Sequence, residues 1–282
     1  MNTEKELSLR LLSLFPTRLI KEHFGCGISE VLNRKNHDSI KNFALNNINN
    51  TKQHVFILEL KKNFNSKSFK VAGFPIEIYK NDIPNGSLIC SHTIEFSVKI
   101  IHENSNSVTK SIIKFIQPIL ISFLGKHIIV QMTILEKNLN HYVNGGKVFE
   151  PIRNVTEDEI ITQICSLFLE EYDAGICDIN KGIKFMWEND LIDSKHVKWK
   201  KKRSTAIETM DEEYTVKQQY PDLYKSLIQS PLNKTLFKYL LDDGELVEHF
   251  TAEPSYGTIN IPIFPKNSNQ INNVINKIIS NN

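Results

Sequence analysis

The sequence lacks the short motifs by which a catalytic or cofactor-binding function is usually identified. It contains no GxSxG nucleophile elbow, no GxGxxG dinucleotide loop, no Walker phosphate loop and no HExxH zinc motif. Its four cysteines show no CxxC spacing, which argues against a zinc ribbon or a disulfide framework, and we expect them to be reduced and mostly buried. Cys90 and His92 form the closest Cys/His pair, and two ligands do not make a metal site. These absences favour a protein without intrinsic catalysis, a metal or a cofactor.

The chain also has little excess of either charge. With 34 Lys and Arg against 32 Asp and Glu, the net charge is +2, so any attraction to nucleic acid must come from a local patch. No segment approaches the ~18 consecutive apolar residues of a membrane helix. The N-terminal apolar run follows two glutamates and contains Arg10, unlike a secretory signal. We therefore expect a cytoplasmic or nuclear protein that is neither secreted nor bound to a membrane.

β-branched residues are densest in the middle of the chain. Ile94, Phe96, Val98 and Ile100 occupy alternate positions, which predicts a strand with one buried face. Polar turn residues separate it from Val108–Ile116, so we expect a hairpin. A short helix from Pro118 to Gly125 and a central strand from Ile128 to Leu135 should follow. The competing interpretation is a helix from Thr109 to Leu124, kinked at its proline.

Helical patterns dominate both ends of the sequence. Thr3 and Glu6 form a capping-box pattern, and Gly25 should end a second helix. The helices predicted before the first strand cover residues 3–14, 17–24, 28–33 and 39–45. His54–Lys61 should form that strand, with Phe69–Tyr79 as its neighbour.

After the central strands, Asn144-Gly145-Gly146 predicts a small hairpin. Helices are then predicted at residues 157–172, 204–218, 221–228, 231–241 and 268–279, with a strand at 257–264. The resulting fold class is α+β, with a largely antiparallel sheet flanked by N-terminal helices and a mainly helical C-terminal lobe. We expect a first domain at residues 1–150 and a second at 151–282, the latter either separate from the first core or continuous with it.

The strongest candidate binding segment is KHVKWKKKR, residues 195–203. Clustered Lys and Arg bind phosphates by releasing counterions, and an aromatic ring stacks on bases or packs under lysine stems. The predicted contact residues are Lys195, Lys198, Trp199, Lys200, Lys201, Lys202 and Arg203. Such a composition is also typical of a nuclear-localisation segment. The alternative is a solvated loop neutralised by the acids around it, namely Glu188, Asp190, Asp193, Glu208, Asp211, Glu212 and Glu213.

A second candidate lies at the end of the first predicted strand. Alternation places Glu59 and Lys61 on one face, and this E-x-K pattern resembles half of the PD-(D/E)xK nuclease fold. The resemblance implies that Glu59 holds a magnesium ion and Lys61 orients the attacking water. Asp38 is the only earlier aspartate that could supply the second acid, but its polar surroundings do not resemble a strand. A charged, exposed strand face explains Glu59 and Lys61 equally well.

These observations favour a non-catalytic protein that acts through macromolecular contacts, with nucleic acid or a nucleic-acid-bound complex as its partner through residues 195–203. The first alternative is a magnesium-dependent nuclease centred on Glu59 and Lys61. The second is a structural subunit of a protein complex, whose apolar segment SYGTINIPIF, residues 255–264, adds a strand to a partner protein.

Overall fold

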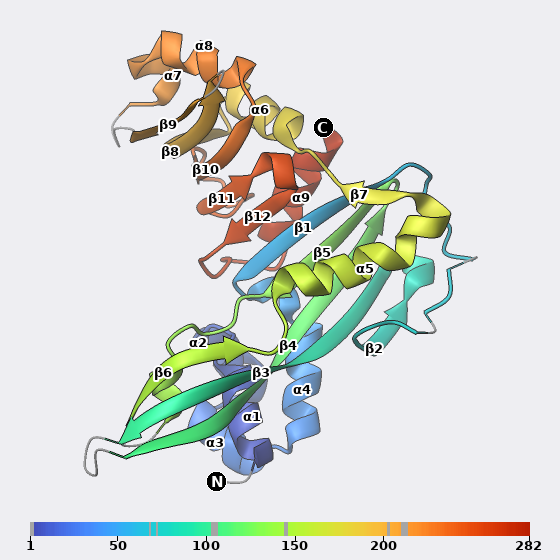
Figure 1. Ribbon diagram of the computed structural model, residues 1–282, viewed down its shortest axis with the longest axis vertical. Helices are drawn as coiled ribbons and strands as arrows, with labels where there is room; N and C mark the ends of the chain where they lie inside the picture. The colour runs from blue at the N-terminus through green and yellow to red at the C-terminus, as the bar shows by residue number, and fades with distance from the viewer. Residues whose placement is uncertain are drawn as a thin grey trace. The chain divides into compact units, whose positions relative to one another are not determined.

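The chain forms two compact units, each built from segments that are far apart in the sequence (Figure 1). Unit 1 consists of Met1–Ile48, Asn65–Ser122 and Met132–Glu171, and unit 2 of Asn49–Phe64, Phe123–Gln131 and Tyr172–Asn282. The structure is a computed structural model that describes residues 3–67, 69–71, 73–102, 107–143, 146–201, 204–209 and 214–282. For residues 195, 196, 198–201 and 204–209 it describes the backbone alone. The predicted α+β class, with N-terminal helices and an antiparallel sheet, is confirmed.

Unit 1 begins with four short helices at the predicted places. They are α1 (Thr3–Leu12), α2 (Thr17–Phe24), α3 (Ile28–Arg34) and α4 (His37–Asn46). The single turn η1 (Ile48–Asn50) follows, and its last two residues belong to unit 2. Gly25 ends α2 with φ 72°, a left-handed conformation that glycine adopts without steric cost. The side chain of Asn36 caps α4 by accepting a hydrogen bond from the Ser39 N–H.

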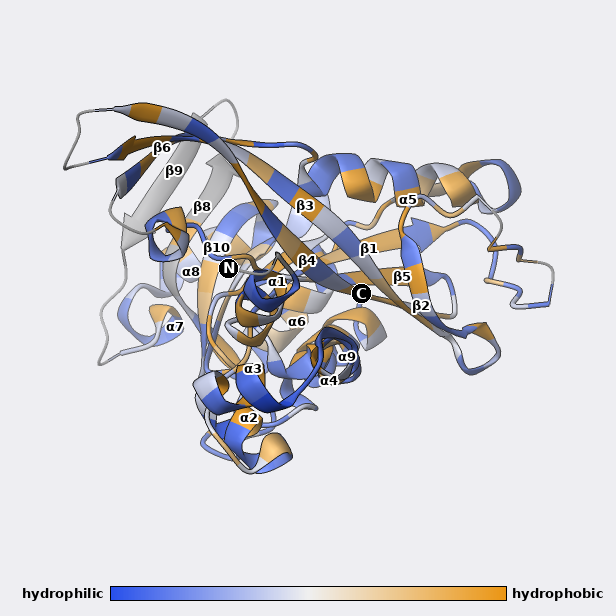
Figure 2. Cartoon of the chain, turned by 90° about the horizontal axis from the view of Figure 1, so that it is seen from below, coloured by the Kyte–Doolittle hydropathy of each residue, from blue (hydrophilic) through white to orange (hydrophobic). Residues whose placement is uncertain are grey.

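The sheet of unit 1 is organised around one long strand, β3. Its four antiparallel strands are β2 (Glu77–Asp82), β3 (Ser87–His102), β4 (Val108–Leu124) and β6 (Gly146–Arg153). β4 pairs along almost the whole of β3, whereas β2 pairs with the first part of β3 and β6 with its last part. The turns η2 (Ile83–Asn85) and η3 (Leu139–Tyr142) lie between these strands in the sequence. Ile94 stands opposite Phe115 and Ile100 opposite Thr109, so the predicted hairpin is confirmed. Figure 2 shows its alternating hydrophobic and hydrophilic residues.

Three local predictions in unit 1 are wrong. No helix begins at Pro118, because β4 continues through it in unbroken register with β3: Gln117 stands opposite His92, and Ile119 opposite Cys90. The strand expected from Phe69 begins only at Glu77, and it pairs with β3. The segment after the predicted glycine turn also pairs with β3, as β6, and not with Tyr142 and Val143; Asn144 and Gly145 lie outside the described residues.

The predicted long helix near the middle of the chain is confirmed as α5 (Glu157–Tyr172). It begins with a capping box, in which the Glu159 N–H donates to the Thr156 hydroxyl and the Glu159 carboxylate accepts from the Thr156 N–H. Its Phe168 is fully buried and stacks on Phe69 at a centroid distance of 4.8 Å.

The sheet of unit 2 has the order β5-β1-β12-β11-β10-β8-β9, with β7 paired to β1. The strands are β1 (Gln53–Leu60), β5 (His127–Thr133, whose last two residues belong to unit 1), β7 (Ala174–Ile176), β8 (Ile192–Lys201), β9 (Ser204–Thr209), β10 (Leu232–Tyr239), β11 (His249–Glu253) and β12 (Thr258–Ile261), with the turn η4 (Pro254–Tyr256) before β12. The first, central and last strands predicted from the sequence, β1, β5 and β12, are confirmed.

The helices of unit 2 are α6 (Asn180–Glu188), α7 (Val216–Gln219), α8 (Pro221–Gln229) and α9 (Gln270–Ser280). The last two are confirmed predictions. The helix expected at 204–218 is wrong, since 204–209 form β9 and α7 has only four residues. The helix expected at 231–241 is also wrong. That segment is β10, and its Thr235, Phe237 and Tyr239 are buried at alternate positions, as in a strand with one covered face.

Aromatic packing fills the core of unit 2. The ring of Trp187 on α6 is 2% exposed and meets the rings of Phe237 and Tyr224 edge-on, each at a centroid distance of 5.6 Å. Phe237 also packs on Phe250 of β11. All four cysteines are free, as predicted, but only Cys90 and Cys177 are buried, and Cys26 and Cys165 are partly exposed. Within the described part of the chain, no helix is long and apolar enough to cross a membrane.

The contact between α6 and α9 depends on a glycine. A methyl group at Gly182 would overlap the carbonyl oxygen of Ile278. We therefore predict that Gly182→Ala lowers the free energy of unfolding by about 2–3 kcal/mol, although alanine has the higher helix propensity by about 1 kcal/mol. Chemical denaturation measures the effect. Gly175→Ala is the matched control, because a methyl group there meets no atom within 4 Å, and its effect should stay within about 0.5 kcal/mol. Equal stability of the two variants would contradict the prediction.

Candidate nucleic-acid interface

The basic segment lies on a strand that is paired along both edges. Residues 195–201 belong to β8, which pairs antiparallel with β10 and with β9. Lys202 and Arg203 lie outside the described residues, as do the side chains of Lys195, Lys198, Trp199, Lys200 and Lys201. The backbone nevertheless fixes the register of the segment, and in an antiparallel pair residues directly opposite each other share one face of the sheet.

A β-bulge determines which residues of β8 share a face. Ser194 stands opposite Phe237, and His196 stands opposite Leu236, so Lys195 is an extra residue between two consecutive pairs. Val197, opposite the buried Thr235, is itself fully buried. Since successive strand residues alternate between faces, positions 196, 198 and 200 belong to the face opposite the core.

Lysines from the neighbouring strand extend this face. Lys198 stands opposite Lys234 of β10, whose side chain is 54% exposed. Lys238 follows on the same face of β10, at the alternate spacing set by the buried Thr235, Phe237 and Tyr239. We call positions 198, 200, 234 and 238 the basic face. Because the sequence of β10 resembled a helix, its two lysines were not among the predicted site residues, although their alternation with buried residues was the available signal.

Trp199 has a different position from the lysines next to it. It stands opposite Leu232 of β10, which is fully buried, and opposite Ala206 of β9. Val197, two residues earlier, is in the core. The register thus assigns position 199 to the same side of the sheet as Leu232 and Val197, and not to that of positions 198 and 200.

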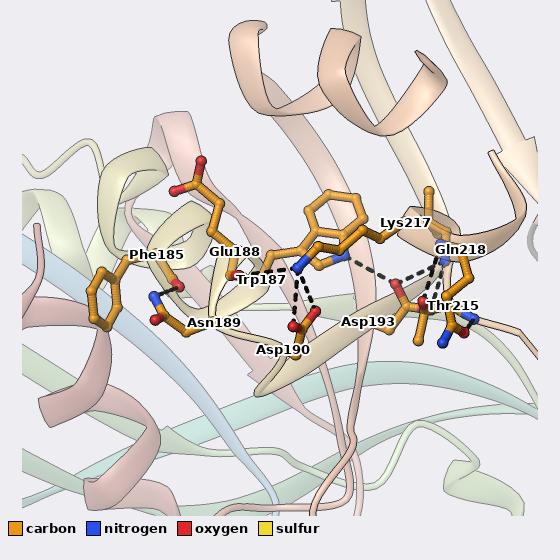
Figure 3. A network of polar contacts seen from close by, with 10 residues as sticks. Phe185, Trp187, Glu188, Asn189, Asp190, Asp193, Thr215, Lys217 and Gln218 are labelled. Carbon is orange, nitrogen blue, oxygen red and sulfur yellow. Dashed lines mark hydrogen bonds and ion pairs between the residues drawn. The ribbon is translucent and has the colours of Figure 1, made fainter. Parts of the chain in front are cut away.

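Two acids expected to neutralise the segment are engaged elsewhere (Figure 3). The buried carboxylate of Asp193 accepts a hydrogen bond from the Trp187 indole N–H at 3.0 Å and from the Val216 backbone N–H at 3.2 and 3.3 Å. The carboxylate of Asp190 accepts from Lys217 Nζ at 2.9 and 3.0 Å. These contacts tie α7 to α6 and to the start of β8.

The register separates a third acid from the basic face. Glu208 stands opposite Val197, a core-side position, whereas Lys198 stands opposite Ile207. Glu188, an exposed residue at the end of α6, is the remaining described acid of the predicted neutralising set, while Asp211 to Glu213 lie outside the described residues.

The nuclease candidates are distributed over both units. Glu59 is an exposed residue of β1 opposite Gly175, and Lys61, just after β1, forms an ion pair with Asp173. Asp38 lies in the first turn of α4 in unit 1. The described residues contain no group of three or more His, Cys, Asp or Glu side chains placed to hold a metal ion. The magnesium-dependent alternative stays a prediction.

The segment proposed to add a strand to a partner is already paired. β12 within residues 255–264 pairs with β1 on one side and with β11 on the other. The backbone of Thr258–Ile261 is therefore paired inside unit 2, and the structural-subunit alternative stays a prediction.

Comparisons with known proteins were made for the whole chain. It matches no protein-family model, no curated protein and no solved structure. The function must therefore be argued from its own residues.

Burial raises the pKa of the Asp193 carboxyl above 3.8, against the opposing effect of the hydrogen bonds from Trp187, Ser194 and Val216. A carboxyl with a raised pKa in the folded state stabilises the fold most when protonated, below pH 3.8, and this contribution is lost as the pH rises through the folded pKa. We predict that Asp193→Asn removes this loss, so the variant becomes more stable relative to the parent protein as the pH rises from 3 to 7.

Urea unfolding at several pH values, followed by tryptophan fluorescence, checks this prediction. Asp222→Asn in the same unit is the control, since its carboxylate is 97% exposed. A constant difference in unfolding free energy between Asp193→Asn and the parent protein at all pH values would contradict the assignment.

Proposed function

We propose that the protein binds nucleic acid, without intrinsic catalysis, through residues 195–203 and the adjoining lysines of β10. The observation that carries the proposal is the register of β8, which places positions 198 and 200 on one face with Lys234 and away from the core. The partner is nucleic acid itself or a complex that exposes it. The basic composition of the segment also favours a nuclear location. The nuclear location and the cytoplasmic alternative both stay predictions.

The physical basis is local charge. The net charge of +2 gives the whole chain little attraction for a polyanion. On the basic face, however, positions 198 and 200 alternate on β8, about 7 Å apart. The adjacent strand β10, about 5 Å away, adds Lys234 and Lys238, which are four residues apart with Leu236 between them. Each phosphate neutralised there releases condensed counterions, which provides affinity that depends on salt and not on sequence.

Three of the described acids near the segment have other partners or another register. Asp190 is paired with Lys217, Asp193 is buried under hydrogen bonds, and Glu208 has a core-side register. Glu253 is the exception, because its carboxylate lies 2.8 Å from Lys234 Nζ. That ion pair is partly exposed and therefore weak, and a phosphate competes with it for the lysine.

The first test removes the charge of the predicted segment. The triple variant Lys200→Glu, Lys201→Glu and Lys202→Glu should weaken binding of a fluorescent single-stranded oligonucleotide at least about 100-fold. The slope of log K against log salt should become shallower by about 2, since about three phosphate contacts are lost. Fluorescence anisotropy at several salt concentrations provides both quantities.

The matched control is Lys21→Glu, Lys35→Glu and Lys67→Glu. It makes the same change in net charge at exposed lysines of unit 1. The control should lose only a few-fold in affinity. The proposal is rejected if the parent chain binds no oligonucleotide or if both triple variants bind it equally.

The second test concerns the lysine that only the structure identified. Glu253→Ala frees Lys234 from its ion pair and should tighten oligonucleotide binding by about 2–5-fold, whereas Lys234→Ala should weaken it by a similar factor. When Lys234 is already replaced by alanine, adding Glu253→Ala should change the oligonucleotide affinity little further. An equal effect of Glu253→Ala with and without Lys234 would show that the two residues act separately and would remove β10 from the interface.

A further inference from the structure

Unit 1 exposes apolar side chains on one face of the strands β6, β3 and β4. Val108 and Ile112 on β4 are 59% and 56% exposed, and Phe149 and Ile152 on β6 are 44% and 67% exposed. Single exposed apolar residues are common, but a contiguous group on a regular sheet indicates an interaction surface. We call these four residues, with Ile101 of β3, the arm patch.

The pairing register shows that the patch is contiguous. Ser97 on β3 stands opposite both Ile112 and Ile152, so these two side chains flank one small residue. Four residues further along β3, beyond the pair of Lys99 and Lys110, Ile101 stands opposite Val108. All belong to one face of the three strands, which lie side by side in Figure 1.

The other face of the same strands is the covered one. Ile94, Val98 and Ile100 on β3 are at most 7% exposed, and Phe115, opposite Ile94, is 1% exposed. The guanidinium of Arg10 on α1 lies 5.7 Å from the Phe115 ring centroid and donates to the Lys114 carbonyl oxygen. Since α1 packs on that side, the arm patch is not the core of unit 1.

Positive charge is interleaved with the apolar residues. Between the apolar rows, Lys99 stands opposite Lys110 on β4 and Phe149 on β6. Lys99 forms an ion pair with Glu150 at 2.5 Å, whereas no ion pair of Lys110 occurs among the described residues. Lys147, opposite Ile101, adds a further positive charge. The face is therefore both apolar and basic.

The edge of β6 is closed to a further strand. Pro151 has no N–H to donate, and Glu150 has φ 47°, at a bulge where three residues of β6 match two of β3. The Val148 N–H is already bonded to the side-chain oxygen of Asn140 at 2.7 Å. Proline and bulges are the devices that prevent edge-to-edge pairing, so a partner must lie on the face of the strands.

We propose that the arm patch docks an amphipathic helix of another protein, with an apolar stripe on the isoleucines and valine and carboxylates beside Lys99, Lys110 and Lys147. A helix is the element that covers a sheet face without using its edge. A second copy of the chain fits poorly, because two identical faces would bring like charges together. The proposal concerns unit 1 and is independent of nucleic-acid binding by unit 2.

Two labelled helical peptides of about 18 residues test the proposal on the full chain. Both carry the same leucine stripe, and their polar positions hold glutamate in one and lysine in the other. By anisotropy, the glutamate peptide should bind at least about tenfold more tightly than the lysine peptide. Ile112→Glu and Ile152→Glu should each weaken that binding about tenfold or more, and Lys110→Glu should reduce the preference for the acidic peptide.

Leu169→Glu is the matched control, since Leu169 is 53% exposed on α5 of the same unit and lies outside the patch. It should leave peptide binding unchanged, and circular dichroism should show that all variants are folded. Three results would overturn the proposal: equal binding of both peptides, no effect of Ile112→Glu, or self-association in sedimentation that Ile112→Glu abolishes. Binding to phosphatidylserine vesicles that depends on Ile112, without any preference between the peptides, would assign the surface to lipid instead.

Discussion

The β-bulge at Lys195 determines which side of the sheet carries the basic residues of β8. Ser194 before the bulge is buried opposite Phe237, and a regular strand would continue with His196, Lys198 and Lys200 on that same buried side. The extra residue reverses the alternation, so that Val197 enters the core in their place. A one-residue shift exchanges every side chain between the two faces, and here it determines on which side of the sheet positions 196, 198 and 200 lie.

The start of β8 is anchored just before this bulge. The carboxylate of Asp193 joins α6, through the Trp187 indole, to α7, through the Val216 backbone N–H. Burial of the Asp193 carboxylate costs desolvation free energy. The hydrogen bonds offset this cost only in part, because the pKa of the carboxyl is still raised. Although the register places Asp193 opposite Lys238, its carboxylate is buried and bonded to the Trp187 indole and the Val216 N–H. An acid that looks in the sequence like a counter-charge for the lysines therefore joins α6 and α7 to the start of β8.

Local signals predicted those parts of the fold that depend on neighbouring residues. The end of α2 followed from Gly25, and the β3–β4 hairpin followed from alternation. The errors arose where pairing with a distant strand overrides local preference. Pro118 is accommodated because β4 is held by β3 on both sides of it, and β10, which contains lysine and leucine at helical spacing, is held by β8 and β11.

The candidate site was predictable in composition but not in geometry. The alternation of His196, Lys198 and Lys200 with Val197 and Trp199 is visible in the sequence, yet interpreting the segment as a charge run gave Trp199 and the lysines the same role. Register separates them, and it also adds Lys234, which no pattern of charge in the sequence connects with Lys198.

Both surfaces of this protein follow from the same physical rule. A strand that is half buried must present its alternate residues to solvent, and the identity of those residues is not constrained by the core. On β8 and β10 the positions facing away from the core include lysines, and on β4 and β6 the exposed positions hold isoleucine, valine and phenylalanine next to lysines. Polar residues would serve solubility better at the latter positions. Because the core does not require apolar side chains at Ile112 or Ile152, their exposure is better explained by a contact outside the chain than by folding.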